Sequence, residues 1–203
     1  MRHQAARLSP VISICGPSGV GKTTVIKGLA KLCPTFIETT KGNPHLKGLL
    51  EGRKEFNAAA NQEWFLKRIG RYIAKAKPNL PLVLDQDPAA IVFGYAKMFL
   101  DEGKMNSTDY ELLLEQLMKI ETSLQRWRSP RTVLFLDAPP VILHRRALNR
   151  ADGKSSVPPL KWFERNRNYF VNLFTCFPKA IRISTVDHSA DEIVERARGL
   201  IER

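Results

Sequence analysis

The chain has 203 residues, of which 43% are hydrophobic and 26% charged, and its formal net charge is +12. This length suits a single domain, residues 1–203, with a core of its own. No apolar run approaches the roughly 20 residues that cross a bilayer, and the basic N-terminus lacks the apolar stretch of a signal peptide. The three cysteines form no C-x-x-C pair. We therefore expect a cytoplasmic protein with free thiols and no membrane partner.

The positive charge fits two kinds of partner, a nucleic acid or a polyphosphate. Much of it lies in residues 145–170, which hold seven basic and two acidic side chains. The sequence contains no zinc finger, RNP pattern or other nucleic-acid module. We therefore favour a small phosphorylated ligand over a nucleic acid.

The first predicted elements enclose a phosphate-binding loop. An apolar, β-prone stretch, Val11–Cys15, precedes the loop, and residues 24–32 follow it with helical spacing of their apolar side chains. Residues 16–23 read Gly-Pro-Ser-Gly-Val-Gly-Lys-Thr, the full G-x-x-x-x-G-K-[ST] pattern. In this pattern Lys22 reaches the β- and γ-phosphates and the Thr23 hydroxyl holds Mg²⁺. The nucleotide-binding residues that we expect are Gly16, Ser18, Gly19, Val20, Gly21, Lys22, Thr23 and Thr24.

Four more short apolar strands follow, separated by helices. The strands are predicted at residues 35–38, 81–85, Thr132–Asp137 and Ala180–Ser184. One helix is predicted over residues 57–75 and another after Pro88. Capping boxes at Thr108 with Glu111 and at Ser189 with Glu192 open two more. This alternation predicts an α/β fold with a five-stranded parallel sheet and helices on both faces.

Polar groups follow three of the predicted strands. Glu38 and Asp85 stand at two strand ends and the phosphate loop at a third. Ligands of such sheets bind at the carboxyl ends of the strands. Residues 152–159 form the one clear loop, inside the basic segment, so residues 145–159 are predicted to be a lid that carries arginines. Together these features predict a site for phosphoryl transfer.

At this point the chain resembles the deoxyribonucleoside kinase family. The resemblance rests on the segments at residues 38–46, 62–68, 95–105 and 135–146, which follow in the family's order over roughly residues 11–188. It implies a P-loop kinase fold and an ATP-dependent kinase whose acceptor is a deoxynucleoside or a similar alcohol. A homodimer is compatible with it.

The resemblance also implies roles for single residues. Glu38 would be the general base, and Asp85 would help Thr23 to hold Mg²⁺. Gln62, Trp64 and Phe93 would form the acceptor site. On the donor side, Arg145 and Arg150 would clamp the phosphates, and Asp187 would border the adenine of ATP.

Three departures lie on the acceptor and sugar side. Gln86 stands where the family has an arginine, Ile91 where it has an acid, and residues 154–156 lack the acid that usually follows the lid arginines. Two alternatives therefore stay open. A nucleoside monophosphate kinase, similar to thymidylate kinase, would use Arg53, Arg68 and Arg71 for the acceptor phosphate. A nucleotide-binding regulator with little turnover would fit the missing arginine.

Overall fold

The computed structural model describes residues 9–45, 57–127, 131–151, 157–177 and 179–202. In these ranges five strands form one sheet in the order β2-β3-β1-β4-β5, with every neighbouring pair parallel. The strands are β1 (Val11–Cys15), β2 (Thr35–Phe36), β3 (Leu82–Asp85), β4 (Thr132–Asp137) and β5 (Ala180–Ser184). The predicted sheet is confirmed. Its register aligns Ile14 of β1 with Asp85 and with Leu134, so the carboxyl ends of the three central strands meet at one edge.

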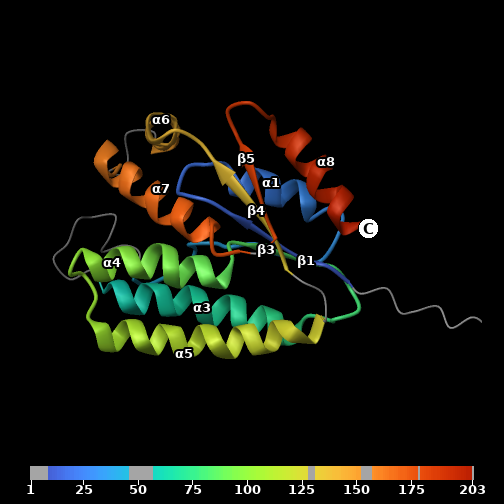
Figure 1. Ribbon diagram of the computed structural model, residues 1–203, viewed down its shortest axis with the longest axis horizontal. Helices are drawn as coiled ribbons and strands as arrows, with labels where there is room; N and C mark the ends of the chain where they lie inside the picture. The colour runs from blue at the N-terminus through green and yellow to red at the C-terminus, as the bar shows by residue number, and fades with distance from the viewer. Residues whose placement is uncertain (1–8, 46–56, 128–130, 152–156, 178, 203) are drawn as a thin grey trace, which may run out of the picture.

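Helices cover both faces of this sheet, as predicted (Figure 1). On one face lie α1 (Lys22–Leu29) and α8 (Ala190–Ile201), and α6 (Pro140–Ala151) follows the carboxyl end of β4. The other face carries α3 (Ala58–Lys75), the π-helix η1 (Ala90–Ala96) that continues into α4 (Lys97–Asp101), α5 (Ser107–Leu124) and α7 (Leu160–Phe174). A short 3₁₀-helix, η2 (Gln125–Trp127), ends α5. Two helical layers therefore enclose the sheet.

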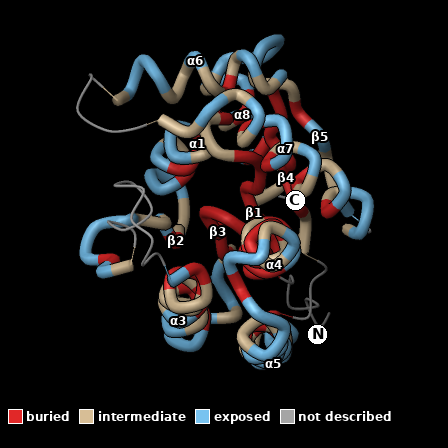
Figure 2. The backbone as a smooth tube through the Cα atoms, turned by 90° about the vertical axis from the view of Figure 1, so that its left-hand side faces the viewer, coloured by how far each residue is buried: buried red, intermediate tan, exposed pale blue. Residues whose placement is uncertain are grey.

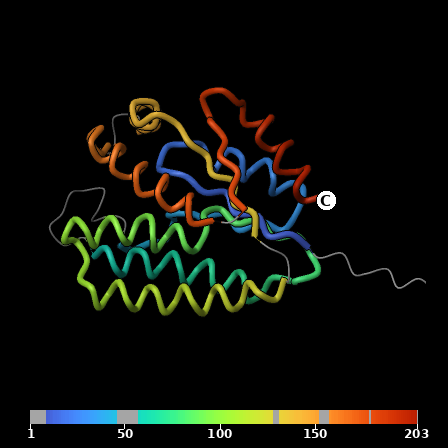
Figure 3. Tube along the Cα trace, viewed as in Figure 1, coloured from blue at the N-terminus to red at the C-terminus, as the bar shows by residue number. Residues whose placement is uncertain are grey.

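The central strands are buried on both faces, which explains their unbroken apolar sequences (Figure 2). In β1, Ile12 and Ile14 pack toward α1 and α8, whereas Val11 and Cys15 pack toward the opposite layer. The first and last helices lie side by side (Figure 3). A Cβ atom on Gly28 of α1 would come within 2.6 Å of Cγ2 of Val194 of α8, so glycine permits this close packing.

The helix starts confirm one of the two predicted capping boxes. Ser189 and Glu192 cap each other at the start of α8. The prediction for Thr108 is wrong, because α5 begins earlier and Asn106 is its cap, accepting the N–H of Asp109 at 2.7 Å. Asparagine is at least as good an N-cap as threonine, so the better cap two residues earlier starts the helix.

Strand β2 is shorter than predicted, and Glu38 lies beyond it. The backbone N–H of Glu38 donates to Oδ2 of Asp85 at 3.2 Å. The chain therefore leaves the ladder after Phe36, since the N–H of Glu38 bonds to a side chain. The predicted strand end at Glu38 is wrong, but the residue is still held against the end of β3.

Candidate active site

The loop between β1 and α1 has a backbone that requires glycine. Gly16, Gly19 and Gly21 have φ values of 152°, 87° and 103°. A Cβ atom on Gly16 would lie 2.3 Å from the carbonyl oxygen of Leu136. No side chain caps the N-terminus of α1 and no acid stands in its first turn. The positive end of the helix dipole is therefore left for an anion.

Lys22 lies folded over the start of this loop. Its Nζ donates to the carbonyl oxygens of Gly16 at 2.8 Å and Pro17 at 3.2 Å. Burial lowers the pKa of Lys22, while the carboxylates of Asp85 and Glu38 oppose that shift. The loop cation therefore shares one electrostatic environment with both acids that the sequence singled out.

Those two acids are held in a weakly solvated corner. Burial, and then the charge of Asp85, raises the pKa of Glu38 to about 7, against the attraction of Lys22 and Arg68. Burial likewise raises the pKa of Asp85 to about 6, opposed by Lys22 and by the N–H of Glu38. Burial thus raises the pKa of both acids at this edge of the sheet above the ordinary range of carboxyl groups.

Two oxygen-bearing side chains at this edge were predicted to hold Mg²⁺. Oδ1 of Asp85 is buried and has no hydrogen-bond partner among the described residues, and the Thr23 side chain is exposed at the start of α1. Both supply oxygen, which Mg²⁺ prefers. No group of three or more His, Cys, Asp or Glu side chains within the described ranges is arranged to hold a metal. Mg²⁺ sites of this kind draw their other ligands from water and substrate phosphates.

On the donor side, a pocket of about 360 Å³ opens beside the loop. Its walls include Gly19, Val20, Thr24, Arg150, Thr185 and His188. The exposed Asp187, predicted to border the adenine, does not line this pocket, although the next residue, His188, does. The pocket is therefore built by the loop, α6 and the segment between β5 and α8.

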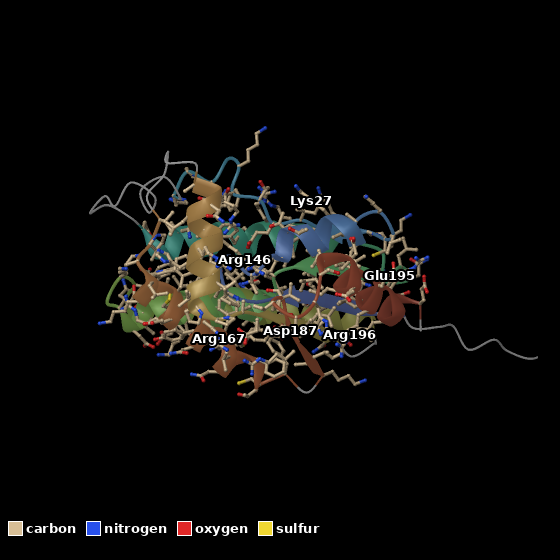
Figure 4. The ribbon with its side chains drawn as sticks, turned by 90° about the horizontal axis from the view of Figure 1, so that it is seen from above. Lys27, Arg146, Arg167, Asp187, Glu195 and Arg196 are labelled. Carbon is tan, nitrogen blue, oxygen red and sulfur yellow. The ribbon has the colours of Figure 1, made fainter. Side chains whose placement is uncertain are left out.

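The arginine that ties these elements together is Arg146. Its guanidinium donates to the carbonyl oxygen of Val20 at 3.3 Å and to both Oγ1 and the carbonyl oxygen of Thr185 at 2.8 Å. Arg146 belongs to α6, and Figure 4 shows it on the side of that helix that faces α1. The sequence prediction chose Arg145 and Arg150. Both are exposed, and of the two Arg150 lines the pocket. In the predicted lid, residues 145–151 belong to α6 and residues 152–156 lie outside the described residues.

Two other arginines, one on α7 and one on β5, are bound to Asp137 at the end of β4. Arg167 donates from Nε to Oδ1 and from Nη2 to Oδ2, both at a distance of 2.8 Å. Nε of Arg182 also donates to Oδ2. Although burial opposes it, these hydrogen bonds lower the pKa of Asp137. Asp137 is therefore a paired anion and no proton acceptor.

The predicted acceptor residues lie on α3 and η1, which pack against each other. Gln62 is buried. Trp64 is partly buried, with the Arg68 guanidinium 4.6 Å from its ring centroid. Phe93 is 42% exposed. Residues 46–56, including Arg53, lie outside the described residues. The structure thus brings the two acceptor elements together, and the roles of these side chains stay predictions.

Gln86, the departure that follows Asp85, has an unusual conformation. Its φ is 75°, and it is the one non-glycine residue of the described ranges with positive φ. Its side chain is fully buried, and neither Oε1 nor Nε2 has a hydrogen-bond partner among the described residues. Strain of this kind concentrates at functional sites. The sequence shows the missing arginine but not this strain.

A glycine-rich loop at the end of β1, a parallel sheet and acids at the same edge define a P-loop kinase. The family model for deoxynucleoside kinases matches residues 12–199, and the chain belongs to this family. It is therefore a phosphotransferase of the nucleoside kinase type that uses ATP as donor. No curated protein matches the sequence. No helix within the described ranges is long and apolar enough to span a membrane.

Solved structures show the same fold. A deoxyadenosine kinase from M. mycoides with bound dCTP has a TM-score of 0.72 at 15% identity, covering 95% of this chain and 98% of that chain. The M. mycoides enzyme with bound dATP gives a TM-score of 0.72 at 14% identity, over 95% of this chain and 99% of the other. At such low identity, the likeness shows the shared fold alone.

Proposed function

We propose that this chain transfers the γ-phosphoryl group of ATP to a sugar hydroxyl of a deoxynucleoside, with Glu38 as general base. The observation that carries the proposal is the shared corner of Lys22, Asp85 and Glu38 at the carboxyl edge. A cation for the phosphates and a proton acceptor for the hydroxyl are the two groups that this reaction needs. The deoxynucleotides bound to the M. mycoides enzyme support an acceptor of this class.

In this mechanism Glu38 removes the proton of the acceptor hydroxyl as its oxygen bonds to the γ-phosphorus. The bond between that phosphorus and the β,γ-bridging oxygen breaks, and ADP leaves. A pKa of about 7 suits the task, since the carboxylate is both available and basic enough near neutral pH. Lys22 stabilises the negative charge on the transferring group.

Mg²⁺ would be held by Thr23 and Asp85. When bound, it supplies charge neutralisation for the phosphates. The buried, unpaired Oδ1 of Asp85 supports this role.

The remaining residues would position the two substrates. Arg150 and the pocket beside the loop would hold the donor, with Arg146 fixing the pocket wall. Arg145 does not line that pocket, so it would reach the phosphates only if α6 turned. Gln62 would bond the acceptor base between Trp64 and Phe93.

The test is ATP consumption by the purified chain against deoxynucleosides, ribonucleosides and nucleoside monophosphates, with Lys22→Ala as the blank. Phosphorylation of deoxynucleosides supports the proposal. Turnover with monophosphates alone would instead support the thymidylate-like alternative. Tight ATP binding without turnover on any acceptor would support a regulator.

A further inference from the structure

Asn166 is a polar residue on the apolar stripe of α7. The buried residues of this helix are Phe163, Asn166, Phe170 and Leu173, whose spacing is that of a helix face turned to the core. The exposed fraction of Asn166 is 0%. A buried carboxamide destabilises a protein unless its polar atoms form hydrogen bonds. Both polar atoms of Asn166 therefore need hydrogen-bond partners.

One of its polar atoms joins α7 to the phosphate loop. The backbone N–H of Ser18 donates to Oδ1 of Asn166 at a distance of 3.0 Å. Because a backbone N–H can only donate, the acceptor end of the carboxamide faces the loop. Nδ2, bonded to the same carbon, is a buried donor with no partner in the part of the chain that the structure describes. An unpaired donor thus lies beside an anion-binding loop.

The position of Lys22 shows which end of the loop this is. Its Nζ bonds to the carbonyl oxygens of Gly16 and Pro17, the two residues before Ser18. The lysine of such a loop reaches the β- and γ-phosphates. Ser18 and Asn166 therefore lie toward the end of the nucleotide that carries the transferred group.

We propose that Asn166 is a γ-phosphate-binding residue whose Oδ1 positions Ser18 and whose Nδ2 donates to an oxygen of the γ-phosphoryl group of ATP. The inference rests on the proposed function, in which the loop holds ATP. It assigns one carboxamide two partners, a loop N–H that is always present and a phosphate oxygen that arrives with the donor. The nucleotide then satisfies the buried donor that the free protein leaves unpaired.

The experiment compares the dissociation constants of ATP and ADP, each with Mg²⁺, by titration calorimetry. The first variant, Asn166→Leu, removes both polar atoms of the side chain. The second, Asn166→Asp, keeps an acceptor for the N–H of Ser18 and replaces the Nδ2 donor with an oxygen. Asn168→Leu is the matched control, since Asn168 is an exposed residue of the same helix. If Asn166→Leu does not fold, the nearly isosteric Asn166→Asp carries the test.

We expect both Asn166 variants to weaken ATP binding about 10- to 100-fold, the range for a hydrogen bond to a charged group, with a much smaller loss for ADP. The control should bind both nucleotides as the wild type does. An unchanged ratio of the ATP and ADP constants in the variants would overturn the assignment, because a residue that only shapes the loop affects both alike. A wild type that binds neither nucleotide would instead refute the proposed function.

Discussion

The donor and acceptor sides of the site hold their charges in different ways. On the donor side, Lys22 and Arg146 bond to backbone carbonyls, so the cations are fixed before a nucleotide arrives. On the acceptor side, Glu38 and Asp85 are crowded and desolvated, and their pKa values are raised to about 7 and about 6. The donor side is preorganised to bind an anion, whereas the acceptor side is arranged to exchange a proton.

The largest expected effect is on the acceptor side. Glu38→Gln removes the proton acceptor while keeping the shape of the side chain, so kcat should fall about 10²–10⁴-fold. The dissociation constant of ATP should change little, because the loop holds the triphosphate. Steady-state kinetics and calorimetry measure the two quantities. Glu111→Gln, an exposed change on α5, is the control, and equal kcat values for both variants would contradict the base role.

On the donor side, Lys22→Ala should lower kcat about 10²–10³-fold, the typical cost of removing one group that stabilises charge in a transition state. Lys27→Ala is the matched control, since Lys27 is exposed on the same helix (Figure 4). Circular dichroism should show an unchanged fold. Undiminished turnover of Lys22→Ala would mean that this loop does not carry the donor.

A smaller effect separates two neighbouring arginines. Arg146→Ala removes three hydrogen bonds that join α6 to the donor pocket, and should weaken ATP binding about 10-fold. Arg145→Ala removes an exposed side chain and should change ATP binding less. Fluorescence titration with an ATP analogue measures both. The reverse order would show that α6 turns Arg145 toward the nucleotide.

The smallest effect is on stability. A carboxyl whose pKa is about 7 when folded, against 4.5 ordinarily, stabilises the fold below pH 4.5, and this contribution is lost as the pH rises toward 7. Glu38→Gln should therefore raise the free energy of unfolding of the nucleotide-free protein at pH 8, by about 1–3 kcal/mol. Urea denaturation measures this. A loss of stability would instead indicate that Glu38 is a structural residue.

Much of this arrangement could be predicted from the sequence. Strands β1, β4 and β5 were predicted with their observed bounds. Strands β1 and β4 are buried and have the short apolar sequences typical of a parallel sheet, whereas β5 is a partly exposed edge strand. The phosphate loop was equally clear, since its glycines meet a backbone requirement that appears directly in the sequence. These features depend on local chemistry.

The missed residues depend on how elements pack. Arg146 lies three residues after the buried Leu143 and so shares its helix face, whereas Arg145 does not. This spacing was a usable signal. Asn166 also had one, as a polar residue within an apolar stripe. The positive φ of Gln86 and the early end of β2 had none, because both follow from contacts at the sheet edge.

The most direct test of the central claim is the pH dependence of phosphoryl transfer by the wild type and by Glu38→Gln, on the same acceptor with saturating ATP. If Glu38 is the base with a pKa of about 7, the wild-type rate should rise about tenfold per pH unit up to pH 7 and then level off. The residual rate of the variant should lack that rise. A wild-type rate that is flat between about pH 5.5 and 8, or an identical profile for the variant, would contradict the account.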